Sequence, residues 1–399
     1  MRGAQTIVLT GGGSGGHITP ILAVADELKK QKPDTRVIYI GQTGDGLGDI
    51  PRLHPSIDEV YTVRAGKFRR YHSKGILQVF DIPTLLKNIR DAFYVIIGFL
   101  QSWFLLRRLK PSVVFVRGGY VGVPVGLAAA RHKIPYLTHD SDAIPSLANR
   151  IISKKAAAHA VALPKENYQY PQDKTFAVGI PLNDAYQPVT PKLEHEYRDG
   201  LHIREDSKVI CITGGGLGAE RLNDAMKTIV PKLMEKYHQL VVIHIAGRKH
   251  EAKVHEFYKQ NLSQSQLEHL LIRGFVNDLY RYSAASDLIV ARAGATNLAE
   301  FAMQRKACII VPNPLLAAGH QIKNAKSLAE QGAIRVVEEG DKLSDELFTT
   351  IVELLDSTEK RMRLAEEFGK FAKPNATEDV VGLIVQTANK RGSKQSVKG

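Results

Sequence analysis

Short runs of β-branched and other apolar residues alternate with longer stretches of helical spacing along most of the chain. Within the longer stretches, apolar positions such as Ile18, Ile21, Leu22, Ala25 and Leu28 return to one helix face. The expected strands form two series: 6–10, 36–40, 113–117 and 158–162, then 208–213, 240–246, 287–291, 307–311 and 334–337. Strands that alternate with helices predict an α/β fold with parallel sheets built from βαβ units.

The series of strands restarts in the second half of the chain. Strand 6–10 runs into the glycines of 11–16 and then a helix, and strand 208–213 runs into the glycines of 214–218 and then a helix. This repetition predicts two Rossmann-like domains that face each other across a cleft at the carboxyl ends of both sheets. We expect an N-terminal domain at 1–182, a C-terminal domain at 183–372, a helix at 373–391 packing back on the N-terminal domain, and a basic tail at 392–399.

The composition of the 399 residues, with 44% hydrophobic and 24% charged, is that of a globular protein and excludes disorder across the whole chain. Two cysteines without a CxxC pair disfavour a disulfide scaffold and structural zinc. The 54 basic residues exceed the 41 acidic residues by 13, which predicts an anionic partner: nucleic acid, phosphorylated ligands or an anionic membrane surface. The first ten residues lack a signal-peptide pattern, so we expect a cytoplasmic protein.

The most apolar stretch, 92–106, is flanked by basic residues and is shorter than the ~20 residues that cross a bilayer. Two alternatives remain: a buried helix with a solvated basic rim, or a patch that enters the membrane interface with its basic residues on anionic headgroups. Because these basic residues accompany an apolar run and not stacking aromatics, nucleic acid is disfavoured. The flanking residues are Arg64, Lys67, Arg69, Arg70, Lys74, Arg107, Arg108 and Lys110.

Three glycine-rich segments follow expected strands: 11–16, 118–119 and 214–218. Glycines let backbone N–H groups approach an anion, and a helix N-terminus adds partial positive charge. The first segment matches GxGxxG and precedes a helix for which we expect Thr19 as N-cap and Pro20 at the first position. No acidic residue ends strand 36–40, which disfavours a dinucleotide-dependent dehydrogenase. Close helix–strand packing is the alternative for each loop alone, but three together predict more than one phosphate-bearing ligand.

Two side chains beside these loops are candidates for chemistry. His17 ends the first loop, where it is either a structural histidine or a general base. Gly294 marks a turn after strand 287–291, and 295–304 has the pattern of a helix whose N-terminus is suited to a phosphate. Glu300 on that helix is either an ordinary solvent-facing residue or a carboxylate that accepts hydrogen bonds from two ribose hydroxyls.

Several segments, in this order and at this spacing, together resemble the MurG-type family of bacterial peptidoglycan glycosyltransferases, glycosyltransferase family 28 with the GT-B fold. They are GGGSGGHITPILAVADEL, GGYVGVPVGLAAA, GGGLGAERLNDAM, ARAGATNLAEFA, residues 312–325 and LAEQGA. The resemblance runs from the first strand to about residue 340. It implies inverting transfer of N-acetylglucosamine from UDP-GlcNAc to lipid I, the undecaprenyl-diphosphate-linked muramyl-pentapeptide, to form lipid II. It also implies a peripheral protein on the cytoplasmic face of the cell membrane.

The resemblance assigns roles residue by residue. His17 matches the base, Val276 the uracil contact, and Glu300 the ribose carboxylate. The acceptor diphosphate is assigned to Gly13, Ser14, Gly15, Gly16, Gly118, Gly119 and Tyr120. The nucleotide sugar is assigned to Gly215, Gly216, Gly218, Val276, Arg292, Gly294, Ala295, Glu300, His320, Gln321 and Asn324.

The chain departs from the family pattern at a few positions. The family's His-Glu-Gln-Asn is 139–142, His-Asp-Ser-Asp, and His320 replaces the first of two paired glutamines. Asp142 and Asp140 therefore compete with His17 as the base. Two alternatives stay open: a related transferase with a different UDP-sugar or lipid acceptor, for example diacylglycerol, and a nucleotide-sugar-binding protein without turnover. We expect no obligate metal or cofactor, because none of the strands expected above ends in an Asp-x-Asp sequence.

Overall fold

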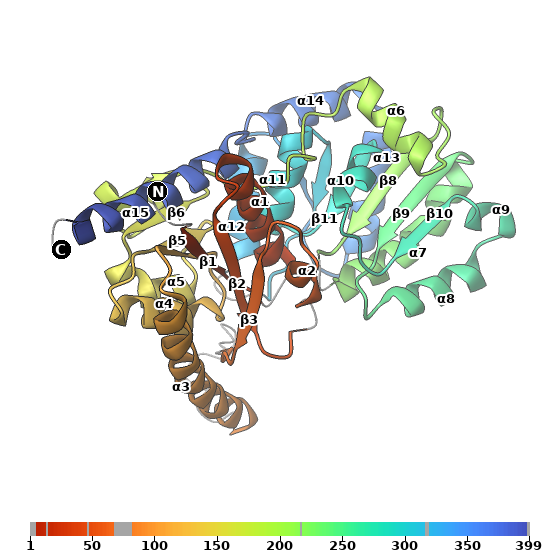
Figure 1. Ribbon diagram of the computed structural model, residues 1–399. Coiled ribbons are helices and arrows are strands. Elements are labelled where there is room, and N and C mark those ends of the chain that lie inside the picture. Colours follow the sequence, from red (N-terminus) through yellow and green to blue (C-terminus); the bar gives the residue numbers. More distant parts are fainter. Residues whose placement is uncertain are drawn as a thin grey trace. The chain divides into compact units, whose positions relative to one another are not determined.

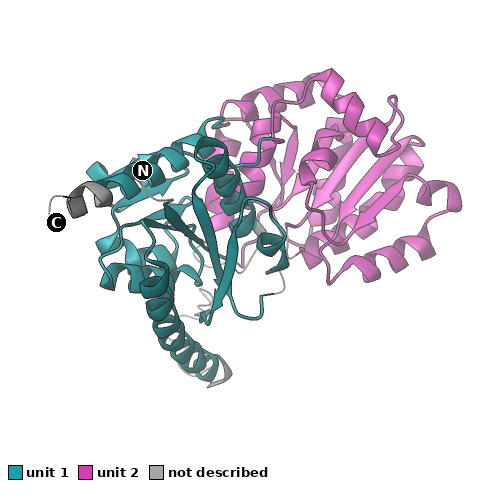
Figure 2. Cartoon of the chain, viewed as in Figure 1, with its two compact units in different colours: residues 1–184, 373–399 teal, residues 185–372 magenta. Residues whose placement is uncertain are grey.

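The structure is a computed structural model that describes residues 5–12, 15–45, 48–67, 82–215, 218–315 and 319–396. It divides into two compact units (Figure 2). Unit 1 consists of Met1–Asp184 and Lys373–Gly399, and unit 2 of Ala185–Ala372. Each unit contains one parallel sheet with helices on both faces, which confirms the predicted α/β class.

The sheet of unit 1 has seven strands in the order β3-β2-β1-β4-β5-β6-β7 (Figure 1). Alternating apolar residues bury both of its faces: Ile7 and Leu9 of β1 pack on one side and Val8 on the other. The strands are β1 (Thr6–Thr10), β2 (Arg36–Gln42), β3 (Glu59–Val63), β4 (Val113–Val116), β5 (Tyr136–Asp140), β6 (Ala158–Val161) and β7 (Thr175–Ala177).

The helices of unit 1 cover the sheet in two layers. One face packs against α1 (Gly15–Gln31) and the chain-terminal α15 (Ala376–Ser396), which also contact each other. The other face packs against α3 (Ile82–Leu109), α4 (Gly122–Arg131) and α5 (Leu147–Ile152). Shorter elements are α2 (Asp49–Arg52) and the 3₁₀ turns Ser153–Lys155, Lys165–Asn167 and Gln172–Lys174.

The sheet of unit 2 has six strands in the order β10-β9-β8-β11-β12-β13. They are β8 (Lys208–Thr213), β9 (Leu240–Ile245), β10 (Leu270–Arg273), β11 (Leu288–Ala291), β12 (Cys308–Ile310) and β13 (Arg335–Val336). One face packs against α7 (Glu220–Lys236), α8 (Glu251–Asn261) and α13 (Leu343–Asp356). The other packs against α6 (Pro191–Gly200), α10 (Leu279–Ala284), α11 (Ala295–Gln304) and α12 (His320–Glu330). The remaining helices are α9 (Gln264–Leu267) and α14 (Thr358–Gly369).

The nine strands predicted from the sequence are all present, with ends shifted by at most two residues. Four strands were missed: β3, β7 and β10 at sheet edges, and β5, which ends in His139 and Asp140. The predicted start of α1 was wrong. The helix begins at Gly15, so Pro20 lies inside it and Thr19 is not its N-cap. The glycine loop is thus shorter than its sequence suggests, because its last two glycines already belong to the helix.

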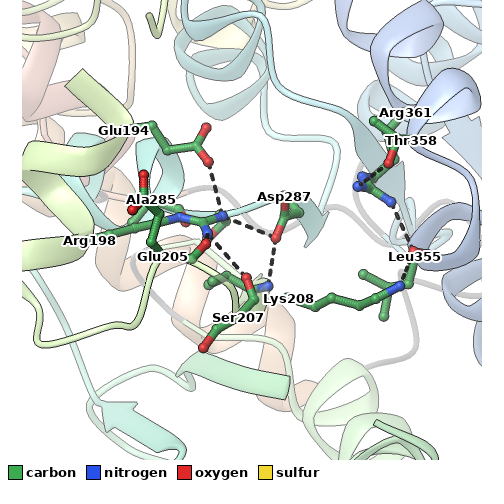
Figure 3. A network of polar contacts seen from close by, with 12 residues as sticks. Glu194, Arg198, Glu205, Ser207, Lys208, Ala285, Asp287, Leu355, Thr358 and Arg361 are labelled. Atoms are coloured by element: carbon green, nitrogen blue, oxygen red, sulfur yellow. Dashed lines mark hydrogen bonds and ion pairs between the residues drawn. The ribbon is translucent and has the colours of Figure 1, made fainter. Parts of the chain in front are cut away.

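A saturated polar network fastens α6 to the sheet of unit 2 at the amino ends of β8 and β11 (Figure 3). The Arg198 Nη2 atom lies 3.0 Å from Glu194 Oε1 and 3.1 Å from Asp287 Oδ2, and Asp287 accepts the Val209 N–H at 2.7 Å. The other nitrogens of Arg198 donate to the carbonyls of Ala285, Glu205 and Ser207. The buried guanidinium and its two half-buried carboxylates thus connect α6 to the amino ends of the strands, opposite their carboxyl ends.

The apolar run 92–106 lies in α3, which reaches out beyond the sheet of unit 1 (Figure 1). One side of α3 is buried, with Ser102 and Leu106 at most 1% exposed. The other side carries eight large apolar residues that are each at least 38% exposed: Leu85, Leu86, Ile89, Phe93, Ile96, Ile97, Leu100 and Phe104, the α3 stripe. The buried-helix alternative is therefore wrong for this face. By length and composition alone, Thr84–Leu109 is sufficient to cross a membrane.

Candidate functional site

The strand order of unit 1 reverses between β1 and β4, which makes a switch point at their carboxyl ends. At such a point the loops after two neighbouring strands run to opposite faces of the sheet and leave a crevice between them. Ligands of doubly wound folds bind in this crevice. His17 follows β1, Arg117 to Tyr120 follow β4, and Asp140 ends β5. The fold thus brings the predicted acceptor residues of two separate loops together at the carboxyl ends of these central strands. Gly13 and Ser14 lie outside the described residues.

The second glycine pair requires glycine for conformational and steric reasons. Gly118 and Gly119 have φ angles of +89° and +75°, a region that residues with a Cβ rarely adopt. A Cβ on Gly119 would lie 2.8 Å from the Gly12 carbonyl oxygen, and one on Gly118 would lie 3.9 Å from the His17 ring. The two glycine loops and His17 therefore lie in close contact. A side chain at Gly119 would prevent this contact.

Two tyrosines hold the loops at this edge. The Tyr39 hydroxyl donates to the Gly11 carbonyl at 2.6 Å, and the Tyr120 hydroxyl donates to Gln42 Oε1 at 2.6 Å. Burial raises the pKa of Tyr39 well above its ordinary value, so its hydroxyl stays a donor. The hydrogen bond of Tyr120 shows that this predicted acceptor residue is already fixed by β2.

His17 is half-buried, and its imidazole lies close to the cation of Arg117. Desolvation, followed by repulsion from Arg117, lowers the pKa of the imidazole from 6.5 to about 4, against attraction from Asp142. Its Nδ1 atom is buried without a hydrogen-bond partner. The imidazole is therefore neutral at physiological pH, which is the form that a general base requires.

Asp140 and Asp142 differ in their surroundings. The Asp140 carboxylate accepts the Ser146 N–H at 2.9 Å and the Tyr170 hydroxyl at 2.8 Å, and desolvation raises its pKa. One oxygen thus holds the loop after β5 and the other the segment after β6, which favours a structural role. Asp142 is half-buried and close enough to influence the charge of His17, so it remains the competing candidate for the base.

Sequence reasoning assigned no role to Arg117, although a charged residue directly after an apolar strand is an available signal. The side chain is 1% exposed, and its Nε and Nη2 atoms are buried without hydrogen-bond partners. His139 is equally buried, and its Nε2 atom lies 2.8 Å from the Gly179 carbonyl oxygen. The site of unit 1 therefore combines buried Arg117, His139 and Asp140 with half-buried His17 and Asp142.

Unit 2 has its own switch point between β8 and β11. The predicted donor loops follow these strands: Gly215 and Gly218 after β8, and Arg292 to Ala295 after β11. A Cβ on Gly218 would lie 2.5 Å from the Ala246 carbonyl oxygen. As predicted, α11 begins at Ala295 with Gly294 as its N-cap, so the helix N-terminus points to this edge. Gly216 lies outside the described residues.

Several predicted donor residues form hydrogen bonds that fix the loops around β11 and β12. Arg292 Nη1 pairs with Glu339 Oε2 at 2.5 Å and donates to the Val311 carbonyl at 3.0 Å. Gln321 accepts the Asn313 N–H at 2.8 Å, and Asn324 donates to the Ala293 carbonyl at 3.3 Å. His320 begins α12, and Val276 follows β10 in a partly buried position. All of these segments follow the carboxyl ends of strands.

Glu300 is buried, at 5% exposure, so the solvent-facing alternative is wrong. Desolvation raises the pKa of its carboxyl from 4.5 to about 8, although a hydrogen bond from Tyr186 opposes the shift. Tyr186 lies outside the regular elements, packs against Tyr280, and offered no signal in the sequence. The carboxyl is thus held at the switch point of unit 2 by a residue far away in the chain.

Among the described residues, no group of three or more histidine, cysteine, aspartate or glutamate side chains has a metal-binding arrangement. The expectation that no Asp-x-Asp lies at a strand end was wrong, because β5 ends at Asp140 and is followed by Ser141 and Asp142. The candidate sites contain backbone N–H groups, two helix N-termini and the ionisable side chains named above. Such sites are suited to phosphate groups and to the charge that develops on a departing diphosphate.

Known proteins match the chain over nearly its whole length. The model of the glycosyltransferase family 28 N-terminal domain matches residues 7–161, and that of the C-terminal domain matches residues 209–380. A UDP-N-acetylglucosamine–N-acetylmuramyl-(pentapeptide) pyrophosphoryl-undecaprenol N-acetylglucosamine transferase of Moorella thermoacetica is 32% identical over 96% of this chain and 98% of its own. The transferase of the same name from Caldicellulosiruptor saccharolyticus is 32% identical over 95% and 96%. The crystal structure of Acinetobacter baumannii MurG superposes with a TM-score of 0.68 and 25% identity over 96% and 99% of the two chains.

Proposed function

Because the chain belongs to glycosyltransferase family 28, we propose that it transfers N-acetylglucosamine from UDP-GlcNAc to undecaprenyl-diphosphate-linked N-acetylmuramyl-pentapeptide. The product is lipid II, the membrane-bound precursor of peptidoglycan. The observation that carries this proposal is the full-length match to transferases named for this reaction. The glycine loops at both switch points support it, since donor and acceptor each carry a diphosphate.

The donor is assigned to unit 2. The N-terminus of α11 and the loop at Gly215 and Gly218 present N–H groups to the diphosphate of UDP, and Glu300 accepts hydrogen bonds from the ribose hydroxyls. As transfer proceeds, the bond between the anomeric carbon and UDP breaks, and its electron pair moves onto the diphosphate. N–H groups fixed before the reaction stabilise this charge, and one such donor typically lowers a barrier by ~3 kcal/mol.

The acceptor is assigned to unit 1, with His17 as the base. The attacking sugar hydroxyl bonds to the anomeric carbon from the side opposite UDP and releases its proton to the neutral imidazole, so the configuration inverts. A positioned base contributes ~10²–10⁴-fold to the rate. The low pKa of His17 keeps the ring free of a proton before the reaction but makes it a weak base, so full proton transfer occurs late, when the hydroxyl has become strongly acidic.

The α3 stripe supports attachment to the membrane that contains the acceptor. Its residues repeat after 11 positions, as in the pairs 85/96, 86/97 and 89/100, so the stripe runs straight along the helix. The exposed charged residues of α3 are all basic: Lys87, Arg90, Arg107 and Arg108. An apolar stripe with basic neighbours is suited to the interface of an anionic bilayer. We therefore assign the protein to the cytoplasmic membrane face as a peripheral enzyme.

The direct experiment is transfer of labelled N-acetylglucosamine from its UDP form to a short-chain lipid I analogue. We expect a single product that carries one added sugar. His320 replaces an expected glutamine near the donor sugar, so UDP-glucose and UDP-GalNAc should be included as competing donors, and diacylglycerol as a competing acceptor. Preferred use of another donor or acceptor would contradict the proposed substrates, and donor binding without turnover would indicate a binding protein. Full activity in excess EDTA is expected, since the proposed mechanism needs no metal.

A further inference from the structure

The buried arginine of unit 1 lies beside both glycine loops. The Arg117 N–H donates to the Thr10 carbonyl at 2.8 Å, which places the residue level with the end of β1. Its Cβ atom lies 3.1 Å from the position that a Cβ on Gly11 would occupy, and Gly118 is the next residue of the chain. The side chain therefore starts at the junction of the two loops that are assigned to the acceptor.

The neighbouring carboxylates do not saturate this guanidinium. Asp140 uses its oxygens for the Ser146 N–H and the Tyr170 hydroxyl. Asp142 and Asp140 attract the charge of Arg117, yet its Nε and Nη2 atoms have no hydrogen-bond partner. Buried donors almost always have partners in folded proteins, and an unpaired one is costly when it is charged.

Arg198 of unit 2 shows how a buried arginine with a structural role differs. Its nitrogens are matched by two carboxylates and three carbonyls (Figure 3). Arg117 is at least as buried, with 1% of its surface exposed against 5% for Arg198, but its Nε and Nη2 atoms have no hydrogen-bond partner. This difference indicates that the Nε and Nη2 donors of Arg117 are available to bind a ligand.

We propose that Arg117 binds the diphosphate of the lipid-linked acceptor, with its unpaired N–H groups donating to phosphate oxygens next to the glycine loops. This inference rests on the proposed function, because it takes the acceptor from it. A guanidinium matches phosphate geometry better than an ammonium, and charge-assisted hydrogen bonds are stronger than the neutral N–H contacts that the glycines provide. Arg117 then secures the acceptor, while His17 receives the proton.

Three variants of the full-length enzyme test this role: Arg117→Met, Arg117→Lys and, as a control, Arg150→Met, which removes an exposed arginine of the same unit. We expect Arg117→Met to raise KM for the lipid I analogue about tenfold or more and to change KM for UDP-GlcNAc less than about twofold. Arg117→Lys should recover part of the loss, and Arg150→Met should behave as wild type. An unchanged acceptor KM in Arg117→Met, or an equal rise in both KM values, would overturn the proposal.

Thermal unfolding without substrates separates binding from a structural role. Because the Nε and Nη2 atoms make no hydrogen bonds in the free protein, Arg117→Met should leave Tm close to that of the wild type. A fall in Tm together with a loss of both substrates would identify Arg117 as structural and would overturn the proposal.

A binding measurement keeps this inference independent of the transfer assay. Citronellyl diphosphate presents the acceptor's head group without its sugar, and inorganic pyrophosphate presents the anion without lipid. We expect the wild type to bind citronellyl diphosphate and Arg117→Met to bind it about tenfold or more weakly. If the wild type fails to glycosylate lipid I but shows this difference, the proposed function fails and the anion site stands. Equal binding of citronellyl diphosphate by both proteins, or a loss confined to inorganic pyrophosphate, would overturn the site.

Discussion

The hydroxyl of Tyr186 donates a hydrogen bond to the buried carboxyl of Glu300 on α11. Burial raises the pKa of both groups, and the hydrogen bond from Tyr186 partly opposes the shift of Glu300, whose pKa is about 8. The free protein thus holds the carboxyl that we assign to the ribose largely protonated at neutral pH. Two ribose hydroxyls are donors and favour the ionised form, so donor binding and the ionisation of Glu300 are coupled.

The first prediction concerns stability. The Glu300 pKa in the folded protein, about 8, lies above the ordinary 4.5, so the folded state retains a proton that the unfolded state loses between these values. The stabilising contribution is complete below about pH 4.5 and is lost as pH rises to about 8, on the order of a few kcal/mol. Glu300→Gln should remove this dependence, so its Tm should exceed that of the wild type at pH 8.5 and match it near pH 5. If Tm of the wild type and of Glu300→Gln changed with pH in the same way, the raised pKa of Glu300 would be refuted.

The second prediction concerns donor affinity. Binding of UDP-GlcNAc should tighten as pH rises from 6 to 8, because less free energy is needed to ionise Glu300. Tyr186→Phe removes a hydrogen bond to the ionised form and should weaken binding several-fold at pH 7, with recovery above pH 9. Titration calorimetry in two buffers of different ionisation enthalpy measures the proton release directly. Tighter binding by Tyr186→Phe at pH 7 would instead mean that its hydroxyl competes with the ribose.

The third prediction concerns the base. The pKa of His17 is about 4, so its base form persists through the neutral range, and kcat at saturating donor should change little between pH 7 and 5.5. His17→Ala should lower kcat ~10²–10⁴-fold with unchanged UDP-GlcNAc affinity, since the histidine lies in unit 1. Asp142→Asn provides the matched test of the competing carboxylate. A far greater loss in Asp142→Asn than in His17→Ala would transfer the role to Asp142.

The fourth prediction concerns the α3 stripe. Phe93→Asp combined with Leu100→Asp places charges on the exposed apolar face and should abolish most sedimentation with vesicles that contain anionic lipid. Leu53→Asp is the control, because Leu53 is 82% exposed and lies outside α3. Turnover with a water-soluble acceptor analogue should be retained in both proteins. Undiminished vesicle binding by the double variant would argue against the membrane role. Arg69 and Arg70, also expected to aid binding, lie outside the described residues.

The fifth prediction compares two glycines of the donor loop. Gly215 and Gly218 have similar φ angles, +79° and +76°, but a Cβ on Gly215 meets nothing within 4 Å, whereas one on Gly218 would lie 2.5 Å from the Ala246 oxygen. Gly215→Ala should therefore cost only the strain of the left-handed backbone, ~1–2 kcal/mol. Gly218→Ala adds a backbone clash and should lower Tm further and weaken UDP-GlcNAc binding more. Equal effects of the two substitutions would show that the loop relaxes around the new side chain.

The sequence by itself determined the alternation of strands and helices, the two glycine-loop openings and the start of α11 at Ala295, directly after Gly294. These features depend on local periodicity and on residues with special backbone freedom, so they can be recognised without knowledge of the neighbours. Pro20 is the exception, because its preference for a helix start was outweighed by a helix that begins at Gly15.

The tertiary structure alone decided which ionisable groups are buried and what they touch. Arg117 and Arg198 are both arginines near a strand, yet one has unpaired donors and the other is saturated, because different distant residues surround them. Likewise, the pKa of His17 and Glu300 depends on desolvation by the packed unit, and the exposure of the α3 stripe depends on which face of α3 packs against α4. Burial and charge are properties of the assembled chain, since they arise from contacts between residues remote in sequence.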